Sequence, residues 1–309
     1  MKPNVALALA SGGPRGFAYI GAIEELQARG YKITSVAGAS AGSLVGGIFA
    51  AGGLEPFKKW LFSLDPVKVM TLMDVSVSKN YLVKGEKVIN EIKSFVPDVN
   101  IEDLSIPFTT IATDLYTGEE VIFREGPLFN AIRASISIPS MFKPVVWKGR
   151  TLVDGGMVNT FPLNRVQRTP GDILVGFNVN QIDAAEIQGF LDSRAAIAQE
   201  RESEHTLLGR IQAGIQAGLQ QRQLEASANN SWIPVGADDN FASILQRSFG
   251  IMNCSLARIG IELTPPDVLA SLPYDSYHGV YGYSHAEEIA TLGRRLMADA
   301  LDQYEKKNA

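Results

Sequence analysis

The sequence predicts an α/β protein with a layered, mostly parallel sheet, helices on both faces of that sheet, and a helical insertion in the C-terminal half. Three observations support this fold class. Short apolar runs alternate with segments of helical spacing through the first half of the chain. The run at residues 5–10 is wholly apolar, as expected for a strand buried on both sides. Residues 41–51 are apolar all round, which predicts a helix packed behind the sheet.

The expected elements follow the chain in order. After the first strand, apolar residues recur at helical spacing from Phe17 to Leu26, and this helix is expected to end at Gly30. A second strand at residues 33–39 leads into the buried helix. Further strands are expected at residues 108–114, 120–123, 145–147, 151–154 and 173–179, with several antiparallel pairs, and a further helix at 241–259.

We expect residues 1–309 to form one domain. Its core covers residues 5–180, and the helical insertion covers residues 181–259, which are rich in Gln, Ala, Glu and Arg. A C-terminal strand and helix occupy residues 260–309. The strand is expected at 267–270, and the helix at a capping box, Ser284-His-Ala-Glu287.

Composition excludes several classes of function. The net charge is −5, with 28 basic against 33 acidic residues, so no broad positive field is available to bind nucleic acid. Cys254 is the only cysteine, which rules out an intrachain disulfide and fits a reduced, cytoplasmic setting. No apolar run is long enough to span a bilayer, so any membrane contact is expected to be peripheral.

The first candidate functional segment is glycine-rich: Ser11-Gly12-Gly13-Pro14-Arg15-Gly16. It lies between an expected strand and an expected helix, where backbone N–H groups can converge on an anion. A dinucleotide-binding loop would require an acidic residue at the end of the second strand, about 20 positions on. The second strand ends instead at Ser40.

Ser40 is the centre of the second motif, Gly38-Ala39-Ser40-Ala41-Gly42. This G-x-S-x-G pattern between a strand and a helix predicts a nucleophile elbow. The small flanking residues permit a strained turn, which lifts the serine hydroxyl out of the sheet. The N-terminus of the following helix then stabilises charge that develops beside it.

A nucleophilic serine requires a base, and Asp154 is the best candidate. It ends an expected strand and opens Asp154-Gly155-Gly156, where the glycines allow a sharp turn. The three histidines, His205, His278 and His285, all lie far downstream. Of these, His278 is the strongest competitor, because it follows the last expected strand.

Together, these three motifs resemble those of the patatin-like phospholipases. The resemblance implies that Ser40 is the nucleophile, Asp154 the base, and Gly12 and Gly13 the oxyanion donors, with Arg15 beside them. It extends to Ser135-Ile-Ser-Ile-Pro-Ser-Met-Phe142 and to Asp154-Gly-Gly-Met-Val-Asn159 with Pro162, and so covers about residues 5–180. Ser11 stands where family members usually have a third glycine.

The resemblance implies an acyl hydrolase that cleaves a lipid or other acyl ester through a Ser-Asp dyad and an acyl-enzyme, with no metal and no cofactor. Two alternatives remain open. One is a Ser-His-Asp hydrolase or acyltransferase that uses His278 or His285 as its base. The other is a regulatory protein of the same fold without catalysis, with residues 181–259 as its contact surface.

Overall fold

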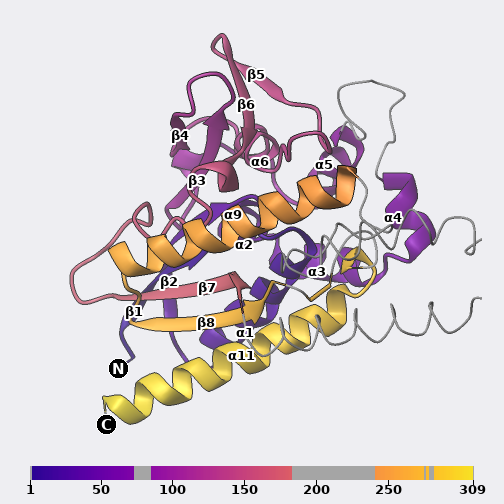
Figure 1. Cartoon of the computed structure of the whole chain (residues 1–309). Coiled ribbons are helices and arrows are strands. Elements are labelled where there is room, and N and C mark those ends of the chain that lie inside the picture. Colours follow the sequence, from indigo (N-terminus) through magenta and orange to yellow (C-terminus); the bar gives the residue numbers. More distant parts are fainter. Residues whose placement is uncertain (1, 73–84, 183–240, 275, 278–281, 309) are drawn as a thin grey trace, which may run out of the picture. The chain divides into compact units, whose positions relative to one another are not determined.

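The computed structural model describes residues 2–72, 85–182, 241–274, 276–277 and 282–308 (Figure 1). The chain divides into two compact units. The first contains residues 1–181 and 249–309, and the second contains residues 182–248. Most of the expected insertion lies outside the described residues.

The first unit is built on an eight-stranded sheet in the order β5-β6-β3-β2-β1-β7-β8, with β4 paired to β3. Strands β3, β2, β1, β7 and β8 run parallel, whereas β4, β5 and β6 join by antiparallel pairing. The expected mostly parallel sheet with antiparallel pairs is confirmed. The strands are β1 Asn4–Leu9, β2 Lys32–Ala39, β3 Phe108–Asp114, β4 Glu120–Phe123, β5 Val145–Trp147, β6 Arg150–Asp154, β7 Ile173–Gln181 and β8 Val268–Pro273.

Alternate residues of β1 enter two different cores. Val5, Leu7 and Leu9 pack with the helices of the larger core, including α1, α2 and α11. Ala6 and Ala8 face the other side of the sheet. There they pack in a smaller core with Phe161 and with Ala257, which lies on α9. Helices therefore lie on both faces of the sheet, as expected (Figure 1).

The helices include four that the sequence analysis did not predict: α3, α4, α5 and α6. Each has seven to nine residues, too few for a clear periodic pattern, and helices this short depend on tertiary packing for their stability. The described helices are α1 Ala18–Ala28, α2 Ala41–Ala50, α3 Leu54–Phe62, α4 Pro66–Leu72, α5 Glu86–Lys93, α6 Leu128–Ser135, α9 Phe241–Leu263 and α11 Ala286–Lys307.

The expected capping box at the start of the C-terminal helix is wrong in its register. Helix α11 begins at Ala286, its N-cap residue is His285, and no side chain caps it. The N–H of His285 donates to the carbonyl of Gly282. Ser284 therefore lies inside a separate turn and not at the helix boundary.

Candidate active site

Ser40 occupies the turn between β2 and α2, as the elbow motif predicts. Its backbone angles are φ 52° and ψ −119°, a conformation that side-chain-bearing residues rarely adopt. The surrounding packing must hold this strain, which is typical of functional sites. The hydroxyl is thereby presented at the N-terminal end of α2.

The small residues of the elbow are required by close backbone contacts. A Cβ atom at Gly38 would overlap the carbonyl oxygen of Gly42, and one at Gly42 would overlap the carbonyl oxygen of Leu9. Any larger side chain at either glycine would push α2 away from the sheet. The G-x-S-x-G spacing thus reflects how tightly α2 lies behind β1 and β2.

The structure brings Ser40 and Asp154 into direct contact. The Ser40 hydroxyl donates a hydrogen bond of 2.5 Å to Oδ2 of Asp154, which ends β6. The other carboxylate oxygen, Oδ1, accepts a 2.8 Å bond from the N–H of Gly156. Both side chains are buried, with 3% and 4% of their surface exposed. The two residues that the motifs singled out thus form one buried pair.

Burial controls the protonation of this pair. It raises the pKa of Asp154 from 3.8 to about 7, although the hydrogen bonds from Ser40 and Gly156 act in the opposite direction. Tyr283 lies nearby, and its own burial together with the charge of Asp154 raises the Tyr283 pKa to about 12. Asp154 therefore exchanges its proton near neutral pH, whereas Tyr283 keeps its own.

The segment that ends α6 holds both members of the pair through their backbones. The N–H of Ser40 donates to Oγ of Ser135 at 2.9 Å, and the N–H of Asp154 donates to the carbonyl of Ser137 at 2.9 Å. Reasoning from the residues did not assign Ser135 a function. The only signal was that it lies in the segment that carries the resemblance.

The glycine-rich loop lies beside Ser40, and Gly13 lines the same pocket. Gly13 has φ 59°, and Ser11 is not among the residues with positive φ. Ser11 therefore suits its position without a third glycine. Within the described residues, the N–H groups of Gly12 and Gly13 donate no hydrogen bond, so both are available to a ligand.

Arg15 is buried beside this loop. Its guanidinium stacks over the ring of Tyr274 at 4.6 Å and donates to the carbonyl oxygen of Tyr274. The structure therefore turns the charged group toward the loop after β8.

An apolar pocket of about 120 Å³ opens at Ser40. Helices α2, α3, α4 and α5 and the segment after α6 supply its walls, and three of these helices, α3, α4 and α5, were not predicted from the sequence. The lining comprises Gly13, Phe17, Ser40, Ala41, Leu44, Phe57, Trp60, Leu61, Leu64, Val69, Leu72, Val88, Ile92, Ile136, Ile138, Phe142 and Tyr283. Such a lining suits a hydrocarbon chain.

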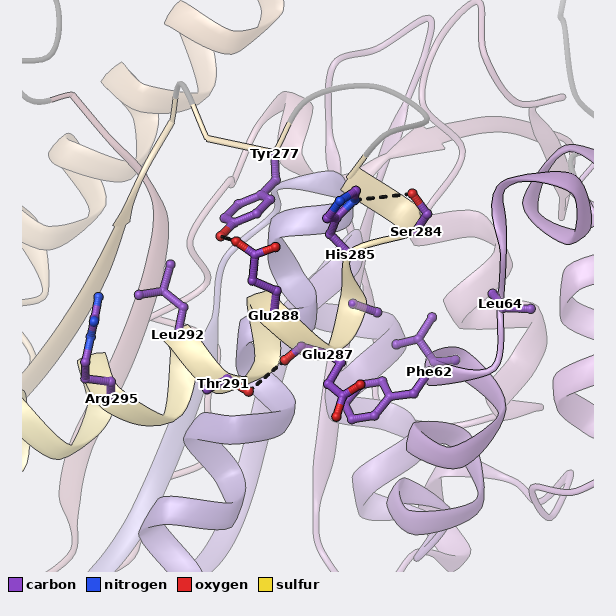
Figure 2. A pocket seen from close by; sticks show the side chains of 12 residues that line it. Phe62, Leu64, Tyr277, Ser284, His285, Glu287, Glu288, Thr291, Leu292 and Arg295 are labelled. Carbon is purple, nitrogen blue, oxygen red and sulfur yellow. Dashed lines mark hydrogen bonds between the residues drawn. The ribbon is translucent and has the colours of Figure 1, made fainter.

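A second, more polar groove of about 670 Å³ lies between the end of α3 and the start of α11. Figure 2 shows Phe62 and Leu64 on one side of it, opposite the α11 side chains. Leu61 and Leu64 line both this groove and the apolar pocket. These two leucines therefore separate the two spaces.

His285, the one histidine among the described residues, does not line the pocket that contains Ser40. His285 lines the polar groove, with Nδ1 3.3 Å from Oγ of Ser284 (Figure 2). His205 and His278 lie outside the described residues.

Across the ranges that are described, no group of three or more His, Cys, Asp and Glu side chains is placed to hold a metal ion. No helix in those ranges has the length and apolar character to cross a membrane.

The chain is similar to several known proteins. The family model described as patatin-like phospholipase matches residues 7–166, which include the loop, the elbow and Asp154. Two NTE family proteins, from Mycobacterium tuberculosis and Mycobacterium bovis, are each 33% identical, covering 98% of this chain and 93% of the relative.

More distant proteins also match. Patatin-like phospholipase domain-containing protein 6 of Mus musculus is 25% identical over 62% of this chain and 14% of its own length. The crystal structure of VipD from Legionella pneumophila aligns with a TM-score of 0.42 and 12% identity over 96% of this chain and 67% of that chain. The family model and the mycobacterial relatives establish that the chain belongs to the patatin-like phospholipase family, a family of lipid acyl hydrolases.

Proposed function

We propose that the chain hydrolyses carboxylic esters of lipids, with Ser40 as nucleophile and Asp154 as its base. The observation that carries the proposal is the buried 2.5 Å hydrogen bond from Ser40 to Asp154 at the mouth of an apolar pocket. A serine and a base in direct contact are the signature of an activated nucleophile. The pocket supplies a site for the acyl chain.

Acylation begins with transfer of the Ser40 proton to Oδ2 of Asp154 as Oγ attacks the ester carbonyl carbon. The tetrahedral intermediate then expels the alcohol, which takes the proton from Asp154 and leaves an ester on Ser40. In the second half, water gives a proton to Asp154 and attacks that ester. This releases the free acid and restores the Ser40 hydroxyl.

The pKa of Asp154 supports its role as base. A carboxylate with an ordinary pKa near 4 accepts a serine proton poorly, whereas a pKa of about 7 makes it a stronger base that is still substantially ionised at neutral pH. The same burial removes most of the surface of the pair from bulk water.

The developing oxyanion is assigned to the N–H groups of Gly12 and Gly13, which donate no hydrogen bond within the described residues. The buried cation of Arg15 lies on the same loop and adds positive potential. No metal or cofactor enters these steps.

The Ser-His-Asp alternative requires a histidine between Ser40 and Asp154, whereas the two side chains bond directly. An acyltransferase would share the acyl-enzyme and differ in its acceptor, so detection of the free acid as the product in water would distinguish the hydrolase from it. Peripheral contact with a membrane remains part of the proposal, because lipid substrates reside there.

Replacing Ser40 by Ala is expected to lower kcat for p-nitrophenyl esters by about 10⁴-fold or more, because the nucleophile is lost. The measurement is steady-state hydrolysis with circular dichroism as the check on folding. Ser43→Ala is the matched control, since Ser43 is buried one turn further along α2 and bonds to Thr110. Substantial hydrolysis by a folded Ser40→Ala variant would refute the assignment.

Replacing Asp154 by Asn is expected to abolish turnover and to stabilise the fold above neutral pH. Because folding raises the pKa of Asp154 from 3.8 to about 7, the native state binds more protons than the unfolded state between these values. The free energy of unfolding therefore falls as pH rises through this window and stays lowered above it. Asparagine does not ionise, so the Asp154→Asn variant does not lose this part of the free energy of unfolding as the pH rises.

Thermal unfolding of wild type and Asp154→Asn at about pH 5 and about pH 8 measures this effect. The Tm of the variant relative to wild type should be higher at the upper pH. The control is Asp114→Asn, because Asp114 is equally buried but lies 3.7 Å from Nε of Arg150 and should gain nothing. An Asp154→Asn difference that is the same at both pH values would contradict a raised pKa.

Leu64 is expected to limit the length of the acyl chain. Leu64→Ala should join the apolar pocket to the polar groove and raise the kcat/KM ratio of p-nitrophenyl palmitate to butyrate by roughly tenfold. Leu64 is preferred to Leu61, which is fully buried and whose truncation would destabilise the core. Leu292 lines the groove but not the apolar pocket, so Leu292→Ala should leave the ratio unchanged. An equal ratio in Leu64→Ala and wild type would show that Leu64 does not limit the length of the acyl chain.

A further inference from the structure

The C-terminal end of β7 carries two buried asparagines, Asn178 and Asn180, that the proposed mechanism does not use. Nδ2 of Asn180 donates to the carbonyl oxygen of Ser11 at 2.6 Å. Oδ1 of the same side chain is buried without a hydrogen-bond partner among the described residues. A buried polar atom without a hydrogen-bond partner destabilises the fold, so an asparagine whose side chain makes this one bond to Ser11 requires an explanation.

We infer that Asn180 is a positioning residue that aims the N–H of Gly12 at the oxyanion formed on the substrate carbonyl. The inference rests on the proposed function and adds a residue that no motif marked. In a trans peptide, the carbonyl of one residue and the N–H of the next point in opposite directions. No peptide bond of the described chain is cis. Holding the Ser11 carbonyl therefore fixes the direction of the Gly12 N–H.

Sheet topology determines which direction that is. Strand β1 lies between β7 and β2, and Asn180 pulls the Ser11 carbonyl toward β7. The Gly12 N–H accordingly points to the β2 side, and β2 ends one residue before Ser40. A Cβ at Gly12 would overlap Cγ2 of Val179, so the loop passes directly against β7 at this point.

A second hydrogen bond to Ser11 comes from the loop that carries the proposed base. The N–H of Ser11 donates to the carbonyl of Thr160 at 2.7 Å, and the Thr160 hydroxyl donates to the carbonyl of Gly156. Gly156 in turn donates to Asp154. Ser11 is thus held on both sides, because its carbonyl accepts from Asn180 and its N–H donates to the Asp154 loop. The proposed oxyanion donor and base are therefore linked by one chain of hydrogen bonds.

The test replaces Asn180 by Ala and, separately, by the near-isosteric Asp, whose carboxylate cannot donate to Ser11. Both variants should lower kcat for p-nitrophenyl decanoate by about tenfold or more, less than the roughly 10²–10³ that follows deletion of a donor, while KM stays close to wild type. Asn178→Ala is the matched control, because the Asn178 side chain accepts from the backbone N–H of Asn180, whereas the bond to the Ser11 carbonyl comes from Asn180. It should keep kcat near wild type.

Two inhibitors separate positioning from general loosening. A decyl trifluoromethyl ketone forms a hemiketal oxyanion on the serine, whereas decyl methyl ether fills the apolar pocket without reacting. The Asn180 variants should lose affinity for the ketone by the factor that kcat/KM falls, with affinity for the ether unchanged. Equal weakening of both inhibitors, or unchanged kcat in folded variants, would overturn the inference. Absence of hydrolysis in the wild type would instead reject the proposed function.

Discussion

The hydrogen bond between Ser40 and Asp154 joins residues that are 114 positions apart in the chain, and both residues are buried. Desolvation gives the carboxylate its raised pKa, so the same burial that costs stability makes Asp154 a useful base in the proposed mechanism. No cation bonds to Asp154 among the described residues; the donors that hold it are Ser40 and Gly156. Most of the surrounding architecture serves to keep this pair in contact and buried.

That requirement explains why so many backbone groups converge on the site. The end of α6 binds the N–H groups of Ser40 and Asp154, and α2 packs so closely behind the sheet that Gly38 and Gly42 cannot carry side chains. The positive φ of Ser40 is maintained by these contacts. A loop fixed only by its own residues would not hold a strained serine within 2.5 Å of a carboxylate.

Motifs in the sequence predicted the core of the site because each motif reports a local constraint. The strand at residues 108–114 is predicted to the residue, and Ser40, Asp154 and the glycine loop are brought together as expected. The apolar pocket could not be predicted, since short helices that lack a periodic signal form it by non-local packing. Ser135 and Asn180 were missed for a related reason, because each acts on the backbone of a residue distant in the chain. The predicted capping box is wrong because the chain forms a turn before the helix, in which the N–H of His285 donates to the carbonyl of Gly282.

The most direct test of a desolvated Ser-Asp pair is the pH dependence of covalent labelling by an alkyl fluorophosphonate, with the modified peptide located by mass spectrometry. Labelling is expected at Ser40, at a rate that rises with pH through a midpoint near 7 as Asp154 loses its proton. The rate should be almost lost in Asp154→Asn. Labelling with a midpoint near pH 4, the ordinary value for a carboxyl group, would contradict this expectation. So would an Asp154→Asn variant that is labelled at the wild-type rate.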